Sequence, residues 1–135
     1  MSCKLHALSA SVFLSVSMMA GAHHSTRVNY QMDTIIELSG TVTDFRWSNP
    51  HGQIFVDVVD EDGETVNWAV ELGSPGNWER NGWDHRTFQP GDDISFRMHP
   101  SRSGQPVGFP EEITMADGTV VSSSGSIIRE TSEQE

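Results

Sequence analysis

The sequence contains one cysteine and one lysine, and both lie within its first four residues. Cys3 stands ahead of the first apolar stretch, so it is not placed as the lipid-bearing cysteine of a lipoprotein. The rest of the chain has no thiol, which excludes disulfide bonds and a cysteine nucleophile there. A small domain without disulfides must be held together by its own hydrophobic core.

The sequence also lacks an apolar run long enough to span a bilayer. Residues 7–19 are apolar and serine-rich, and they fall short of the roughly 20 residues that a transmembrane helix needs. They follow Lys4 and precede Ala20-Gly21-Ala22, a small-x-small pattern typical of a signal peptidase site. The pattern predicts a cleaved signal peptide over residues 1–22 and a periplasmic or secreted protein whose mature chain begins at His23.

Positive charge is scarce in the predicted mature chain. Seven arginines stand against nineteen acidic residues, which leaves a net charge of −12. A surface this negative repels phosphate backbones and anionic lipid headgroups. We therefore expect no nucleic-acid partner and no membrane partner after signal cleavage.

Short segments in which apolar and polar residues alternate predict β-strands. In chain order these segments are residues 35–47, 51–59, 65–72, 94–99, 113–115 and 119–121. Ser74 and Pro75, followed by Gly82, predict one short helix after the third strand. The pattern indicates an all-β fold, a small five- to six-stranded barrel of the oligonucleotide/oligosaccharide-binding (OB) type, with a flattened open sandwich as the alternative.

The expected domain spans residues 23–121. Gly40, in the middle of the first strand, predicts a bulge or bend. Residues 100–110 hold three prolines and two glycines, which predicts a surface loop. Residues 122–135 are rich in serine and glutamate and have two apolar members, Ile127 and Ile128, so we expect a disordered acidic tail.

Six segments spread over the predicted mature chain form a recognisable set. They are Ala-His-His-Ser at 22–25, Gly-Thr-Val-Thr-Asp-Phe-Arg-Trp-Ser-Asn-Pro-His at 40–51, Asn-Trp-Ala-Val-Glu-Leu-Gly-Ser-Pro at 67–75, Gly-Trp at 82–83, Pro-Gly-Asp at 90–92 and His-Pro at 99–100. Together they resemble an uncharacterised family of small exported bacterial proteins, domain of unknown function 6152. The resemblance implies a shared fold and compartment. It carries over no catalytic residue, because the family has no assigned activity.

The predicted cleavage would give His23 a free α-amine beside its imidazole ring. The amine and ring Nδ1 can chelate one metal ion in the arrangement called a histidine brace, and further imidazoles complete a nitrogen set that suits Cu(II). The candidate partners are His24, His51 and His99, and for His99 we prefer exposure to water. The alternative is that His23 and His24 form a solvated terminus and that His51 caps a turn.

Four tryptophans are many for so small a domain. Trp47, Trp78 and Trp83 are candidates for a ligand platform at a barrel rim, because indole rings stack on sugars and other flat ligands. Trp78 and Trp83 flank the predicted helix end, where packing is the alternative role. We assign Trp68 to the core, and we single out Glu71 among the acids as a candidate ligand-binding or acid–base residue.

Two functions remain open at this point. The first is an exported copper-binding protein with an N-terminal histidine brace. The second is a metal-independent OB-like module that binds a small ligand, an oligosaccharide or a partner protein of the envelope. The sequence has no Gly-x-Ser-x-Gly elbow and no phosphate-binding glycine loop, so it supports no enzymatic activity.

Overall fold

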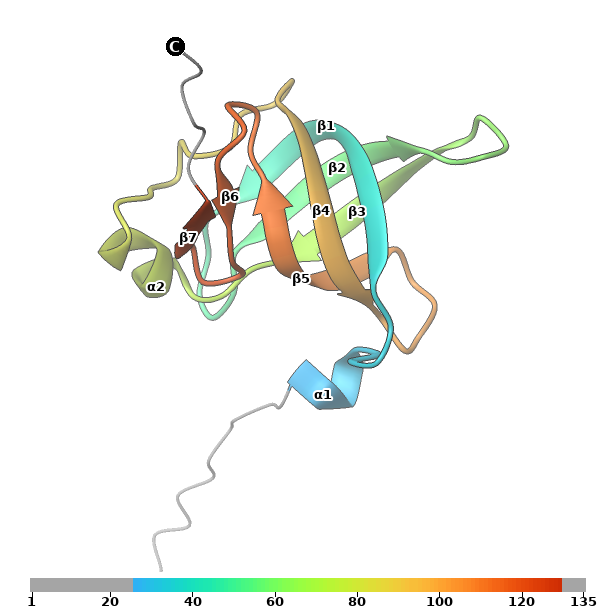
Figure 1. The fold of residues 1–135 in the computed structure, drawn as a ribbon, viewed down its shortest axis with the longest axis horizontal. Coiled ribbons are helices and arrows are strands. Elements are labelled where there is room, and N and C mark those ends of the chain that lie inside the picture. Colours follow the sequence, from blue (N-terminus) through green and yellow to red (C-terminus); the bar gives the residue numbers. More distant parts are fainter. Residues whose placement is uncertain (1–25, 130–135) are drawn as a thin grey trace, which may run out of the picture.

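The computed structural model describes residues 26–129 (Figure 1). The predicted signal peptide, its cleavage point and the histidines at 23 and 24 lie outside the described residues, as do residues 130–135. The described elements are α1 (Thr26–Asn29), β1 (Ile36–Arg46), β2 (Gln53–Val59), β3 (Thr65–Glu71), α2 (Pro75–Arg80), β4 (Asp93–Pro100), β5 (Val107–Thr114), β6 (Val120–Val121) and β7 (Ile127–Arg129). Neither of these two helices is long and apolar enough to cross a membrane.

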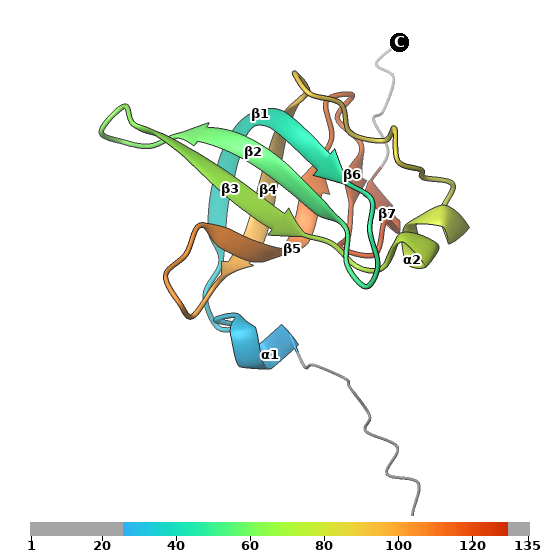
Figure 2. The same cartoon turned by 180° about the vertical axis from the view of Figure 1, so that it is seen from behind.

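The strands form one sheet that closes on itself. Their order is β3-β2-β1-β4-β5-β6-β7, and a parallel pairing of β3 with β5 joins the first strand of this order to the fifth. The other pairings in the barrel are antiparallel. This closure makes a five-stranded OB-type barrel with β6 and β7 added beside β5 (Figures 1 and 2). The predicted all-β barrel, with one short helix after the third strand, is confirmed.

The barrel is filled by the side chains that alternate inward along its strands. In β2, Ile54, Val56 and Val58 are buried, while Gln53 and Asp57 are partly exposed. The same alternation continues in the neighbouring strands and produces one core cluster. Its members are Val42, Ile54, Val56, Val58, Val70, Leu72, Trp78, Phe88, Ile94, Phe96, Met98, Ile113 and Val121. The alternation of apolar and polar residues in the sequence therefore identifies the face of each strand that meets the core.

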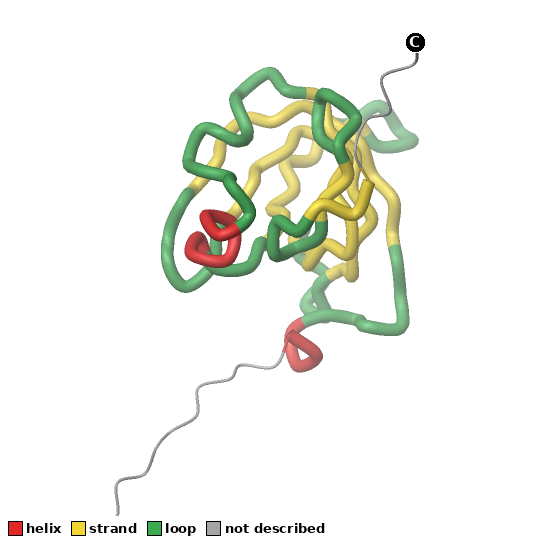
Figure 3. Tube along the Cα trace, turned by 60° about the vertical axis from the view of Figure 1, so that its left-hand side comes forward, coloured by secondary structure: helices red, strands yellow, loops and turns green. Residues whose placement is uncertain are grey.

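Aromatic rings gather between the barrel and α2. Consecutive ring pairs run Trp47–Phe45, Phe45–Phe88, Phe88–Trp78 and Trp78–Trp83, with centroids 5.2 to 6.4 Å apart. In Figures 1 and 2, α2 lies on one side of the barrel, and the β2–β3 hairpin extends from the opposite side. Figure 3 shows that the short α1 stands apart from α2.

The predicted surface loop at residues 100–110 is wrong in its second half, because β5 already begins at Val107. Gly108 and Pro110 are buried within the strand. The register of β5 against β4 shifts beside Pro110, and a proline, which has no N–H to donate, is tolerated at such an irregularity. The backbone at Gly108 lies close to the side chain of Met98, and a Cβ at position 108 would lie 2.3 Å from the sulfur of Met98. Glycine, which has no Cβ, avoids this overlap.

The disorder expected after residue 121 is also wrong for residues 122–129. These residues turn back along the barrel and add β7 to β6. The indole N–H groups of Trp78 and Trp83 donate to the backbone oxygens of Ser123 and Gly125 at 2.9 and 2.6 Å. The segment is therefore held by hydrogen bonds from the indole N–H groups of buried Trp78 and partly buried Trp83 to its backbone. A search for apolar residues in the tail does not detect such bonds.

Gly40 is not the site of a bulge, one of the two features predicted for it. It pairs regularly with Ile94, and the register irregularity of β1 against β2 falls between Val42 and Asp44. A Cβ at Gly40 would lie 2.1 Å from the carbonyl oxygen of Asp57, a backbone atom that cannot move aside alone. The glycine therefore permits two strands to approach closely.

Replacing this glycine tests the close approach. We expect Gly40→Ala to lower the free energy of unfolding by about 3 kcal/mol, because the new methyl group overpacks the contact with Asp57. Gly52→Ala is the matched control, since a Cβ there meets its nearest atom at an ordinary 3.5 Å. Urea unfolding of both variants checks the prediction, and equal stability of the two would contradict it.

Candidate functional site

Tyr30 anchors the segment that leads into the barrel. Its side chain is 4% exposed, and its hydroxyl group donates a hydrogen bond to a carboxylate oxygen of Glu71. The backbone at Tyr30 bridges to Ser101, which follows β4, and the ring lies 5.9 Å from the ring of Phe109. The chain immediately after α1 is thus fixed to the end of β3 and to the loop between β4 and β5.

Glu71 also faces His51 from the other oxygen of its carboxylate. Glu71 Oε1 lies 3.7 Å from His51 Nδ1, and this nitrogen lies 3.1 Å from the carbonyl oxygen of Leu72. The backbone N–H of Leu72 donates to the carbonyl of Gly52, so the end of β3 and the start of β2 hold the histidine in place. We call Tyr30, His51 and Glu71 the tyrosine–glutamate–histidine group.

His51 is oriented as a metal-binding histidine would be. A carbonyl oxygen can only accept, so Nδ1 carries the proton in its contact with Leu72, and Nε2 of the neutral ring keeps its lone pair. The side chain is 45% exposed. Metal-binding histidines commonly donate their second N–H to a carbonyl or carboxylate, which fixes the ring and the tautomer. His51 can therefore offer Nε2 to a ligand from solvent.

Burial and the carboxylate of Glu71 raise the pKa of Tyr30 well above its ordinary value. Burial disfavours the phenolate, and the hydrogen bond and negative charge of Glu71 favour the protonated hydroxyl. Because the folded chain binds this proton more tightly than the unfolded chain, the contribution to stability is complete below pH about 10 and is lost as the pH rises further.

This shift is measurable because Tyr30 is the only tyrosine in the sequence. We expect no tyrosinate absorbance near pH 10 while the protein remains folded. Glu71→Gln should lower the pKa of Tyr30 part of the way toward its ordinary value, because the negative charge is removed. The fall is incomplete because Tyr30 remains buried. Ultraviolet titration, with circular dichroism as a check on folding, makes the measurement. Ionisation of the folded wild-type protein near pH 10 would rule out the buried hydrogen bond.

His99 does not face water, contrary to our preference. It is 5% exposed, with Nδ1 lying 2.9 Å from the carbonyl oxygen of Thr34 and Nε2 lying 3.2 Å from a carboxylate oxygen of Glu111. Thr34, in the segment just before β1, covers His99 on the outer face of β4. The alternation of apolar and polar residues within β4 does not reveal this contact. Because both ring nitrogens already face partners, we leave His99 out of the ligand set proposed below.

The three tryptophans considered as a ligand platform pack within the protein. Trp78 is fully buried, and Trp47 and Trp83 are partly buried against the core. The N–H groups of Trp78 and Trp83 are used by the backbone of residues 122–129. These rings close the α2 side of the barrel. Trp68, which we assigned to the core, packs against it but is only partly buried.

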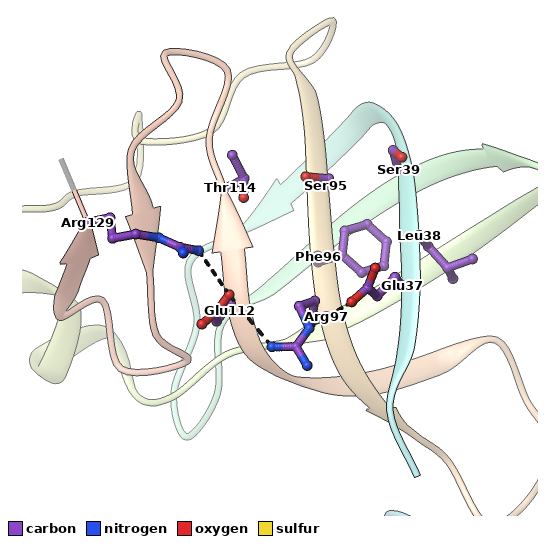
Figure 4. A pocket seen from close by; sticks show the side chains of 9 residues that line it. All are labelled: Glu37, Leu38, Ser39, Ser95, Phe96, Arg97, Glu112, Thr114 and Arg129. Carbon is purple, nitrogen blue, oxygen red and sulfur yellow. Dashed lines mark hydrogen bonds and ion pairs between the residues drawn. The ribbon is translucent and has the colours of Figure 1, made fainter. Parts of the chain in front are cut away.

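A hollow of about 440 Å³ lies on the outer face of the sheet (Figure 4). A row of opposite charges crosses it. Arg97 lies 2.9 Å from Glu37 and 3.9 Å from Glu112, and Arg129 lies 3.3 Å from Glu112. Opposite charges face each other throughout this row, and exposed pairs of this kind contribute little energy each. The row links β7 to β5, β4 and β1 and is assigned a structural role.

Within residues 26–129, no group of three or more histidine, cysteine, aspartate or glutamate side chains is arranged to hold a metal ion. A site with three such ligands that included His51 would therefore need at least one ligand from outside this range. The histidines at 23 and 24 are the nearest candidates along the chain before Tyr30.

Comparison with known proteins gives a family but no curated relative. The model described as "Family of unknown function (DUF6152)" matches residues 11–110. This range includes all three members of the tyrosine–glutamate–histidine group, and β6 and β7 follow it. No curated protein matches the chain. Since the match covers most of the sequence, the chain belongs to this family of unknown function, DUF6152.

Proposed function

We propose that this is an exported copper-binding protein, periplasmic or secreted, which holds one Cu(II) ion between the terminal His23 of its processed chain and His51. The observation that carries the proposal is the orientation of His51, whose Nδ1 faces a carbonyl oxygen and whose Nε2 is left to a ligand. The protein would hold, deliver or sequester the metal outside the cytoplasm, with no nucleic-acid or membrane partner.

The donor set suits the metal. The α-amine and ring Nδ1 of His23 would supply two nitrogens, and Nε2 of His51 would supply a third. His24 or a water molecule would complete a planar arrangement, which Cu(II) favours with nitrogen donors. Copper is preferred here because the proposed ligands are nitrogens, whereas oxygen ligands would suit calcium or magnesium.

The reach of the chain is compatible with this site. His23 stands seven residues before Tyr30, and seven fully extended residues span at most about 25 Å. The four residues of α1 shorten this reach. Tyr30 and His51 contact opposite oxygens of the same carboxylate, so the anchor of the terminal segment and the proposed ligand lie at one place on the barrel.

Glu71 is a positioning residue in this proposal. It touches the anchor tyrosine and the histidine, and it places a negative charge beside Nδ1 of His51. A carboxylate near the far nitrogen of a ligating imidazole makes that ring a better electron donor to the metal. The acidic surface of the protein adds a general attraction for cations.

Removing the imidazole of His51 tests the proposal. We expect His51→Ala to weaken Cu(II) binding by at least about tenfold, since a ligand is lost. His85→Ala is the matched control, because His85 is an exposed histidine in the segment after α2. Competition with a chelator of known copper affinity measures both variants. Equal affinities for the two would show that His51 does not hold the metal.

A further inference from the structure

A cavity of about 520 Å³, which we call the mouth cavity, is lined by β1 and the β2–β3 hairpin. This hairpin extends from the side of the barrel opposite α2 (Figures 1 and 2). The lining residues of the cavity are Glu37, Leu38, Ser39, Val58, Val59, Asp60, Glu61, Val66 and Trp68. Cavities that hold small molecules commonly have volumes of roughly 300 to 1,000 Å³, so this one is large enough for such a ligand. It shares no residue with the tyrosine–glutamate–histidine group.

The floor of this mouth cavity is apolar because of the strand register. Val58 pairs with Val66, and Trp68 follows two residues later on the same face of β3. These side chains and Leu38 of β1 point toward the barrel interior. Trp68 and Leu38 pack on the core but remain partly exposed. The barrel therefore presents part of its own interior to solvent in the mouth cavity.

The rim of the mouth cavity is acidic. Asp60 accepts hydrogen bonds from the backbone N–H groups of Asp62 and Glu64, and these two bonds fix the hairpin tip. Glu61 stands next to it in the same tip, and Glu37 reaches the rim from β1, where Arg97 pairs with it at 2.9 Å. Among the residues that the structure describes, no basic side chain lines the cavity. The rim thus carries negative charge above an apolar floor.

We propose that the mouth cavity binds a small organic cation that has an apolar body, such as an alkyl- or arylammonium ion. The apolar body would lie on Leu38 and Val66, and the cation would lie between the face of Trp68 and the carboxylate of Glu61. A tryptophan face attracts ammonium groups through its quadrupole, and the attraction grows as water is excluded. The rim disfavours anions, and the aliphatic floor gives a sugar few hydrogen-bonding partners. This site is independent of the copper site.

The full chain, exported and purified with EDTA, is titrated with benzyltrimethylammonium by isothermal calorimetry. Binding in the presence of EDTA separates this site from the copper proposal. We expect saturable binding of the cation and no saturable binding of benzenesulfonate, which carries an anionic group on the same ring. Binding of the sulfonate with equal affinity, or no binding of the cation, would overturn the inference.

Variants locate the bound cation. We expect Trp68→Leu to weaken binding by roughly threefold to tenfold, since the aromatic face is lost while an apolar side chain remains. Glu61→Gln should weaken it with little effect on folding, because the side chain is at an exposed hairpin tip. Asp62→Asn is the matched control, since Asp62 lies in the same tip but does not line the cavity. Equal affinities of Glu61→Gln and Asp62→Asn would place the ligand elsewhere and overturn the inference.

Discussion

Acetylation of the α-amine of His23 in the processed protein will lower its Cu(II) affinity on the order of 100-fold or more. The processed chain has no lysine, so the α-amine is its one reactive amine, and the acetylated amine no longer forms a chelate ring with the imidazole. Chelation makes the second bond intramolecular, and gains of about 10² to 10⁴ in apparent affinity are typical when two binding groups are linked. Every side chain of the protein is unchanged, so the effect isolates the terminal amine.

The matched control is the same protein taken through the acetylation procedure without the acetyl donor. It has the same sequence and side chains, and its N-terminal amine is free. Copper affinity is measured for both by competition with a chelator. If the two proteins bind copper equally well, the amine of His23 is not a ligand and the histidine brace is wrong.

Trp78→Ala will destabilise the protein by about 3 to 5 kcal/mol, the usual cost of removing a buried tryptophan. Trp78 is fully buried, packs against Phe88 and Trp83, and donates its N–H to the backbone of Ser123. The substitution removes the apolar packing around α2 and also releases the segment that leads to β7. Urea unfolding provides the free energy.

A second substitution at this position separates packing from the hydrogen bond. Trp78→Phe keeps an aromatic ring but removes the N–H that donates to the carbonyl oxygen of Ser123. This oxygen still accepts from the backbone N–H of Gly73 at 2.7 Å, so we expect a smaller loss of about 1 kcal/mol. A loss below about 0.5 kcal/mol for Trp78→Ala, the range usual for surface changes, would mean that this tryptophan does not join α2 to the rest of the protein.

The barrel was predictable because apolar and polar residues alternate along its strands, and because proline and glycine mark the segments between them. Val56 and Val58 in β2 mark the inward face, and Pro75 begins α2 as expected. The errors have a shared cause. Pro110 and Ser123 lie in segments whose composition is typical of loops, yet each is held by a partner distant in sequence. Tertiary contacts of this kind leave no local pattern.

The candidate site was predictable only in part. His51 and Glu71 stood out as an isolated imidazole and an acid beside a turn, but their approach depends on the pairing of β2 with β3. Tyr30 was missed, because its contact with Glu71 joins residues 41 positions apart. Its one sequence signal is that it is the single tyrosine of the chain and precedes the first strand. Trp68 packs against the core, as assigned, but is only partly buried. Alternation shows which face a residue occupies, but not how completely its neighbours cover it.

The most direct test of the copper proposal is the intact mass of the exported protein, measured under native conditions after incubation with Cu(II) and removal of excess metal. We predict one species, with the mass of a chain that begins at His23 plus one copper ion. A chain that begins at any other residue, or one that begins at His23 and retains no copper, would contradict the proposal.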